Sequence, residues 1–371
     1  MGKETTDRRT QLTLWTRRFS ALVDAGVSLR LCLATLEQEP STPDLRDVTR
    51  ELGERVEQGE TMSQALSNWP DLFDEDYLSS FRMGEIGGVL DDALSHLVGR
   101  MERGLAPVPV TPGHISRAEV AEWVWRLAKM LEAGVPLLSA LGTLAEIGPP
   151  VLRRVSQEMR EEVGVGGALA PDDENASLAT QPALWRYPGL FHPTTLRLFG
   201  FAVWFGPFAP RVLKAAELLE AEALLEIQGK LSPLALPEPA GAVPAPSQTA
   251  SAHPVVRQVN ALLGDAIRGG ARWVSLRPGD AGAGQAGLTA EGAVSPYAVV
   301  ALTQYDQVTR RLKVMAGLDP FVRDDRQAYL TSEIHVRHEG QDYRLHLRSA
   351  GRLQGDEIHL SLSKGEGAVQ V

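Results

Sequence analysis

Apolar residues recur at helical spacing through most of the chain and alternate at strand spacing only toward its end. One early apolar stripe is interrupted at Gly26, which predicts two helices instead of a single long one. A third helix is predicted after the Ser41-Thr42-Pro43 cap, and a capping box at residues 61–64 begins a fourth. Further helices around 77–83 and 90–101 complete an antiparallel bundle of about six helices.

This helical pattern occurs twice. Residues 16–40 read TRRFSALVDAGVSLRLCLATLEQEP, and residues 124–148 read VWRLAKMLEAGVPLLSALGTLAEIG. The aligned pairs include Arg18 and Arg126, Gly26 and Gly134, and Leu33 and Leu141. A Pro-x-Leu-Phe sequence at 70–73 returns at 188–191 after a longer interval, so the second copy carries an insertion, the acidic segment 169–182. The pattern indicates two copies of a small domain, because the repeat is too long for a solenoid.

From about residue 254 the pattern becomes that of a small α+β domain with an antiparallel sheet. Helices are predicted at 255–267 and 305–315. Strands are predicted at 273–276, 334–337, 343–347 and 358–362, with a hairpin turn at 339–342. Residues 281–287 (AGAGQAG) are expected to form a flexible loop, because a phosphate-binding loop would need a Gly-Lys-Ser/Thr ending that is missing here.

Proline-rich stretches mark the predicted domain boundaries. The predicted order is a helical bundle at 1–104, a linker at 105–117, a second and degenerate bundle at 118–230, a Pro/Ala-rich linker at 231–253, an α+β domain at 254–364 and a tail at 365–371.

Composition narrows the classes of function. The 371 residues carry a net charge of −10, which argues against nucleic acid as the main partner. The single cysteine, Cys32, excludes an internal disulfide framework and fits a reducing compartment. The longest apolar run, residues 198–210, is shorter than a bilayer span and is interrupted by glycine and proline, so it predicts a buried helical segment. We therefore expect a cytoplasmic chain without a membrane span, peripheral at the inner membrane at most through partners.

Four short motifs lie in a fixed order in the first repeat. They are Gly26-Val27-Ser28-Leu29, the segment GETMSQAL at 59–66, the segment PDLF at 70–73, and Gly84-Glu85-Ile86-Gly87-Gly88. In order and spacing they resemble the cytoplasmic domains of the type II secretion system F family, the inner-membrane platform proteins of secretion and type IV pilus machines. The second repeat has Ala202-Val203 in place of the Gly-Glu pair and resembles a degenerate copy. That family continues into membrane-spanning helices where this chain has proline-rich linkers.

The C-terminal part resembles a second family, the regulatory N-terminal half of the secretion and pilus motor ATPase. The resemblance rests on Val256, Asn260, Leu263, Ala266-Ile267, Gly270-Ala271 and the sequence RLKVMAGLD at 311–319. It ends before the catalytic half of such an ATPase would begin. Because the chain also has no Walker A sequence, we expect no ATP hydrolysis, no enzymatic activity and no bound cofactor.

Two groups of residues are candidates for contacts. Carboxylates and glycines gather at Gly84, Glu85, Gly88, Asp91 and Asp92, where three readings stay open: a partner contact, a cation site, or a purely structural helix start. A surface role predicts that Glu85→Ala changes stability by no more than about 0.5 kcal/mol. In the predicted sheet, Arg337, Arg344 and Arg348 share the polar face with His335, His346 and His359 and could contact a phosphate or an acidic partner.

Together these resemblances predict a soluble, non-enzymatic adaptor or assembly protein of a type II secretion or type IV pilus-like system. Its expected partners are the motor ATPase and the inner-membrane platform proteins, and a homo-oligomer stays open. The alternative is a regulator that binds a nucleotide through the C-terminal domain. A lineage-specific remnant without a secretion role is the third reading.

Overall fold

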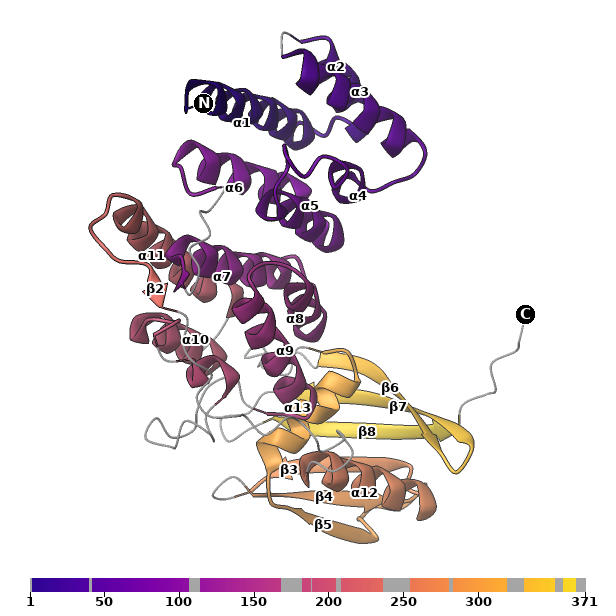
Figure 1. The fold of residues 1–371 in the computed structure, drawn as a ribbon. Coiled ribbons are helices and arrows are strands. Elements are labelled where there is room, and N and C mark those ends of the chain that lie inside the picture. Colours follow the sequence, from indigo (N-terminus) through magenta and orange to yellow (C-terminus); the bar gives the residue numbers. More distant parts are fainter. Residues whose placement is uncertain are drawn as a thin grey trace. The chain divides into compact units, whose positions relative to one another are not determined.

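The computed structural model describes residues 2–39, 42–106, 114–167, 182–187, 189–204, 208–235, 254–279, 283–318, 330–350 and 356–364. The chain forms two compact units. The first consists of Met1–Val135, Ser139–Ser156 and Ala209–Pro237, and the second consists of Pro136–Leu138, Gln157–Phe208 and Glu238–Val371. Figure 1 follows the elements along the chain.

The first repeat forms the predicted six helices. They are α1 (Gly2–Asp24), α2 (Leu29–Glu37), α3 (Pro43–Glu57), α4 (Met62–Leu66), α5 (Glu75–Gly87) and α6 (Leu90–Glu102). Thr42 accepts a hydrogen bond from the Leu45 amide at the start of α3, and Thr61 and Gln64 form the predicted capping box of α4. The apolar stripe closes around an aromatic core that includes Phe19, Phe73 and Phe81.

The second repeat follows the same order of elements. It consists of α7 (Arg117–Glu132), α8 (Leu137–Glu146), α9 (Pro150–Gly164), a short 3₁₀ helix (Ala183–Arg186) in place of α4, α10 (Pro193–Trp204) and α11 (Phe208–Ile227). A two-residue strand at each end, β1 (His114–Ile115) and β2 (Leu234–Ala235), pairs the start of this repeat with its end. Pro188 and most of the predicted insertion lie outside the described residues.

Matched contacts show that the repeat extends to side-chain detail. The indole of Trp15 donates to the Thr49 hydroxyl at 3.0 Å, and the indole of Trp123 donates to the Ser156 hydroxyl at 2.8 Å. In both copies the glycine after the first helix adopts a left-handed conformation, with φ of 76° at Gly26 and 83° at Gly134. The equivalence of the two glycines is therefore confirmed.

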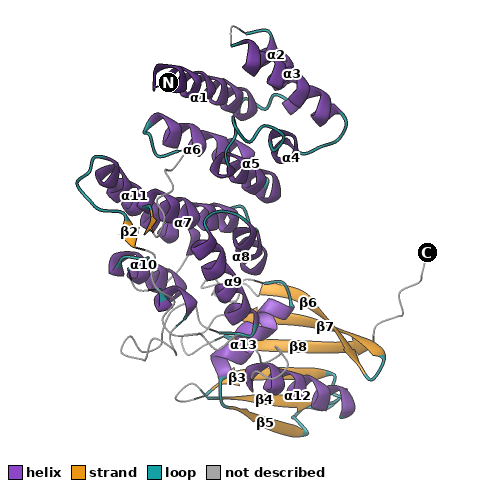
Figure 2. Ribbon diagram, viewed as in Figure 1, coloured by secondary structure: helices purple, strands orange, loops and turns teal. Residues whose placement is uncertain are grey.

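The C-terminal part is an antiparallel sheet with two helices, as Figure 2 shows. Its strands are β3 (Trp273–Pro278), β4 (Gly284–Thr289), β5 (Ala298–Leu302), β6 (Leu330–His338), β7 (Gln341–Ala350) and β8 (Glu357–Lys364), in the order β5-β4-β3-β8-β7-β6. Helices α12 (Pro254–Arg268) and α13 (Tyr305–Met315) share one apolar core with the inward side chains of the sheet. Glu339 and Gly340, both with positive φ, form the predicted hairpin turn between β6 and β7.

One expectation for this sheet is wrong. Residues 284–287, expected in a flexible loop, lie in β4, and β5 was not predicted at all. The glycines there make room for packing: a Cβ on Gly284 would come within 2.0 Å of the Tyr305 ring, and one on Gly287 within 2.9 Å of Pro296. Glycine in this strand therefore permits close packing.

Because a Cβ added at Gly26 or at Gly134 would meet open space, replacing either glycine tests the backbone conformation alone. We expect Gly26→Ala and Gly134→Ala each to lower the free energy of unfolding by about 1 kcal/mol, since alanine disfavours positive φ. The matched control is Gly99→Ala inside α6, where alanine should stabilise by about 0.5–1 kcal/mol. Chemical denaturation measures all three. Unequal losses at the two equivalent glycines would contradict the match.

Candidate functional site

The corner between α5 and α6, which we define as Gly84, Glu85, Gly88, Asp91 and Asp92, differs from the predicted glycine turn. Helix α5 continues through Gly84 and Glu85 to Gly87, and only Gly88 is left-handed, with φ of 66°. The Val89 amide donates to the Gly84 carbonyl at 3.0 Å and closes the helix end. A Cβ on Gly84 would lie 2.9 Å from the Cα of Leu90, so this glycine lets the two helices pack closely.

Glu85 of the α5–α6 corner has structural contacts. Its carboxylate accepts from the Ser63 hydroxyl at 2.6 Å and from the Ser63 amide at 3.3 Å. Ser63 lies in the first turn of α4, where backbone amides have no partner within the helix and favour a negative charge. Glu85 therefore fixes the start of α4 against the end of α5.

The two aspartates of the α5–α6 corner lie in the first turn of α6 and are exposed. Asp92 forms an ion pair of 3.0 Å with Lys129 of α7, which also binds Glu132 at 2.7 Å. Burial would lower the pKa of Lys129, but its contacts with Glu132 and Asp92 outweigh burial and raise that pKa. The side chains of the described residues include no group of three or more potential metal ligands placed to hold an ion.

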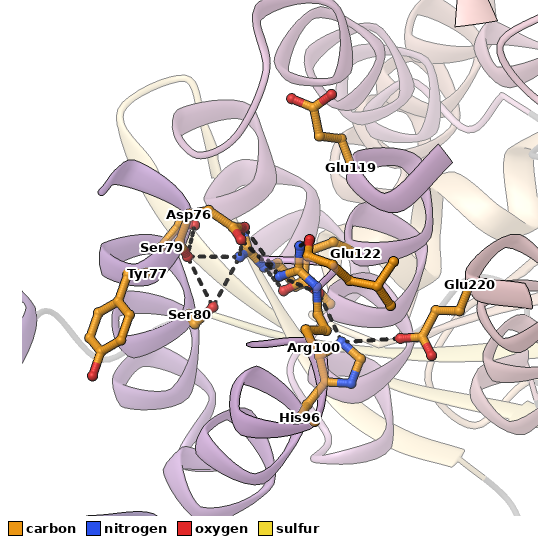
Figure 3. Close-up of polar contacts among 12 residues, drawn as sticks. Asp76, Tyr77, Ser79, Ser80, His96, Arg100, Glu119, Glu122 and Glu220 are labelled. Carbon is orange, nitrogen blue, oxygen red and sulfur yellow. Dashed lines mark hydrogen bonds and ion pairs between the residues drawn. The ribbon is translucent and has the colours of Figure 1, made fainter. Parts of the chain in front are cut away.

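Between α5, α6 and α7 lies a set of charged side chains that we call the buried ion cluster: Asp76, Arg100, Glu122 and Arg126. Three of them are buried, and the side chain of Asp76 is 24% exposed. Arg100 is 2% exposed, and its guanidinium Nη1 lies 3.0 Å from Asp76 Oδ2 and 3.1 Å from Glu122 Oε2. Arg126 Nε donates to Glu122 Oε1 at 2.6 Å, and its Nη2 donates to Asp76 Oδ1 at 3.2 Å. Figure 3 shows Asp76 and Glu122 directed at Arg100, with Tyr77 turned away.

Two positive and two negative charges make the buried ion cluster balanced. Burial would raise the pKa of Glu122, but the charges of Arg100 and Arg126 outweigh it and hold that pKa well below its usual range. Burial would also lower the pKa of Arg100, and the charges of Asp76 and Glu122 outweigh it and raise that pKa. Glu122 and Arg100 are therefore both charged at neutral pH.

A histidine extends the buried ion cluster toward α11. His96 Nε2 lies 2.8 Å from Glu122 Oε2 and 3.6 Å from Glu220 Oε1. Its ring stacks on Trp125 with centroids 3.7 Å apart and planes 3° from parallel. Glu220 also pairs with Arg103 at 2.8 Å. Side chains from four helices thus join one connected set of polar contacts.

The sequence reasoning missed the buried ion cluster, although one signal was present. Apolar residues fall on nearly every side of the predicted helix at residues 118–131, and a helix that is apolar all round is buried. Glu122 and Arg126, four positions apart on this helix, are therefore charges that need buried partners. The partner in the first repeat could not be identified without the three-dimensional arrangement.

The arginines of the predicted polar face lie on the outer face of β6 and β7, as expected. Arg337 lies 3.7 Å from Asp342, and Arg344 lies 3.6 Å from Glu333. Arg348 is exposed, and no carboxylate of the described residues pairs with it. These arginines belong to the second unit, and the α5–α6 corner belongs to the first.

Lys313, in the sequence RLKVMAGLD at 311–319, has a structural position. It is fully buried and forms an ion pair of 2.5 Å with Asp356, whose carbonyl accepts from the Tyr305 hydroxyl at 2.5 Å. This part of the sequence therefore fixes α13 to the segment before β8.

Removing one member of the buried ion cluster should be costly. We expect Glu122→Gln to lower the free energy of unfolding by about 3 kcal/mol at pH 7, because two buried arginines lose a countercharge. The folded-state pKa of Glu122 is depressed, so its contribution is complete above the unfolded pKa of about 4.3 and disappears as pH falls through the folded pKa. The difference between wild type and variant should shrink accordingly in acid.

The measurement is urea denaturation at several pH values. The control is Glu132→Gln. Because the Glu132 side chain is exposed, we expect this change to alter the free energy of unfolding by no more than about 0.5 kcal/mol. If Glu122→Gln lowers the free energy of unfolding by the same amount at pH 7 and in strong acid, Glu122 does not stabilise the cluster through its charge.

The contacts of Glu85 revise the stability expected of its variants. We now expect Glu85→Ala to cost about 1 kcal/mol, more than a surface change, because the start of α4 loses its carboxylate. Ser63→Ala should cost about as much, and the double variant should cost less than the sum. Asp91→Asn at the same corner is the exposed control. Strictly additive losses in thermal denaturation would mean that Glu85 and Ser63 act independently.

Among the helices that the structure describes, none combines the length and apolar character needed to cross a bilayer.

The first repeat is similar in sequence to a known protein family. Residues 15–106 match the family described as type II secretion system (T2SS), protein F. The chain is 36% identical over 92 residues to the type IV pilus assembly protein PilC of Myxococcus xanthus, covering 25% of this chain and 22% of that protein. It is 33% identical over 91 residues to type II secretion system protein F of Vibrio cholerae, covering 24% of this chain and 22% of that protein.

A similar match, 31% identical over 94 residues, covers 25% of this chain and 23% of PilC of Thermus thermophilus. The chain thus aligns with less than a quarter of the length of these relatives. The matched span includes the C-terminal part of α1, helices α2 to α6 and the whole α5–α6 corner. Residues 15–106 are therefore similar to the type II secretion system protein F family, and the similarity covers about a quarter of this chain.

Proposed function

We propose that the chain is a non-enzymatic assembly component of a type II secretion or type IV pilus-like system. The observation that carries the proposal is the similarity of residues 15–106 to protein F, with relatives that are named for secretion and for pilus assembly. The proposed partners are the motor ATPase and the inner-membrane platform proteins. The proposed domains are the two bundles at 1–104 and 118–230 and the α+β domain at 254–364, which resembles the regulatory half of the ATPase.

The contacts of the α5–α6 corner reduce the set of its residues that are available to a partner. Asp92 already pairs with Lys129, and Glu85 already binds Ser63, so these two side chains have partners within the chain. Ile86, in the last turn of α5, is 53% exposed, and Asp91, in the first turn of α6, is also exposed. An exposed apolar side chain and an exposed carboxylate at one corner suit a protein interface, in which an apolar anchor is surrounded by polar groups. We therefore propose Ile86, Gly88 and Asp91 as the part that meets a partner.

The test is co-purification of the tagged full-length chain from its native cells, with the motor ATPase quantified by mass spectrometry. We expect Ile86→Asp to reduce recovered ATPase about tenfold, equivalent to about 1.4 kcal/mol. The matched control is Leu31→Asp on α2, a similar side chain that is 57% exposed. Both variants should keep their melting temperature, because the replaced side chains are on the surface. Equal recovery with Ile86→Asp and Leu31→Asp would reject this docking surface, and no ATPase with wild type would reject the proposed partner.

A second candidate function, a nucleotide-responsive regulator, is favoured by one observation. Arg348 is exposed on β7 without a carboxylate partner among the described residues, and arginine suits phosphate recognition. If this function holds, ATP or ADP should raise the melting temperature of wild type, and Arg348→Ala should abolish the shift. Arg337→Ala, whose arginine faces Asp342, is the control. No nucleotide-dependent shift in wild type would reject this second function.

A further inference from the structure

The two repeats pack on each other through the last helix of the first copy, α6, and the first helix of the second copy, α7. Arg100 and His96 of α6 lie 3.1 and 2.8 Å from the carboxylate of Glu122 on α7 (Figure 3). The two helices run antiparallel, since Asp92 in the first turn of α6 pairs with Lys129 in the last turn of α7. The last helix of one copy thus receives the first helix of the next copy.

Helix α11 of the second copy presents the same face as α6, but in α11 this face is exposed. The repeated Pro-x-Leu-Phe sequence aligns α11 with α6 from the first residue of each helix. In this alignment Leu218 takes the position of Arg100. Leu218 is 46% exposed, whereas Arg100 is 2% exposed. Ala221 and Leu225 follow on the same face at helical spacing and are also exposed, so α11 presents an open apolar site.

Helix α1 of the first copy presents the same face as α7, and this face is exposed as well. The tryptophans of the matched hydrogen bonds, Trp15 and Trp123, align the two helices, and Leu14 then takes the position of Glu122. Leu14 is 39% exposed, whereas Glu122 is 4% exposed. Ala21, two turns further along α1, is also exposed. The ion pair between the repeats thus corresponds to one exposed leucine on α1 and one on α11.

We propose that α1 of one copy of this chain binds α11 of a second copy, antiparallel, as α7 binds α6 within the chain. Leu14 then contacts Leu218. The short side chains of Ala21 and Ala221 let these two helices approach more closely than long charged side chains would. The contact goes beyond the proposed secretion role and does not depend on it.

The lengths of the two helices agree with this arrangement. Helix α1 extends beyond the equivalent of α7 at its N-terminal end, and α11 extends beyond the equivalent of α6 at its C-terminal end. Antiparallel packing brings these two extensions side by side. The contact between copies is therefore longer than the contact between α6 and α7 on which it is patterned.

Local charge favours α1 as the occupant of the α11 face. Helix α11 has four acidic and two basic residues, and α1 has three acidic and five basic residues. Two α11 helices or two α1 helices would repel each other, whereas α1 and α11 attract. Where Arg17 comes opposite Lys214, Glu217 provides a countercharge, since its carboxylate lies 2.6 Å from Lys214. Charges further apart than about 8 Å are largely screened at physiological ionic strength, so these facing charges outweigh the net charge of −10 on each copy.

Sedimentation equilibrium of the full-length chain tests the proposal. A contact between two different faces leaves an α1 and an α11 open at the ends of every row of copies, so association continues beyond a dimer. Because a contact between two helices is small, we expect the mean mass to rise with concentration over the range up to about 1 mM. A wild-type chain that is monomeric throughout this range would overturn the proposal.

Charge exchange identifies the contact. Leu14→Glu and Leu218→Arg should each weaken association at least about tenfold, because an unpaired charge replaces an apolar contact. An equimolar mixture of the two variants should regain association, since the two new side chains reproduce the pair of Glu122 with Arg100. The matched control is Leu31→Glu on α2, another exposed leucine, which should associate like wild type. Association that is unchanged in both variants, or weakened in both and not regained on mixing, would overturn the proposal.

Cross-linking with a short bismaleimide tests which faces meet. A mixture of Leu14→Cys and Leu218→Cys should give a linked dimer, and neither variant alone should, because each face meets only the other. The native Cys32 is buried, and wild type gives the background reaction. Linking of either variant with itself at the yield of the mixture would overturn the head-to-tail arrangement. Variants that link only to another protein in cell extract, and not to each other, would replace the second copy by that protein.

Discussion

The buried ion cluster constrains the arrangement of the first unit. Its carboxylates and guanidinium groups come from α5, α6 and α7, and each carboxylate contacts both arginines. Charges out of water are tolerated only with their partners, so separating α7 from the first repeat would leave buried charges uncompensated. A helix that the sequence assigns to the second repeat is therefore fixed to the first. The position of α7 also explains why Lys129 reaches Asp92 and why a Cβ added at Gly87 would lie 3.8 Å from the Met130 side chain.

This constraint distinguishes two copies that share their local design. The Trp-to-hydroxyl bond and the left-handed glycine occur in both repeats, because both serve the packing of the first three helices within a copy. The aligned arginines differ: Arg18 pairs with Glu39 at the half-exposed surface at 2.6 Å, and Arg126 enters the buried ion cluster. An equivalent position thus has a surface ion pair in one copy and a buried inter-repeat contact in the other.

Much of the local structure could be predicted from the sequence. The caps at Thr42 and Thr61, the break at Gly26 and the hairpin at Glu339 depend on neighbouring residues, so short patterns were sufficient. What the sequence could not provide were contacts between distant segments. Gly284 looked like loop glycine because its reason, the ring of Tyr305, lies on another element. Glu85 looked like a surface residue because Ser63, its partner, belongs to a different helix.

The central claim is that α7 is held on the first repeat by charge, and a double-mutant cycle on Asp76 and Arg126 tests it most directly. The free energy of unfolding is measured for the full-length chain, Asp76→Ala, Arg126→Ala and the double variant. Because the two side chains are in contact within one network, the account predicts a coupling energy of about 2 kcal/mol. A coupling energy below about 0.5 kcal/mol, the range of independent sites, would contradict it.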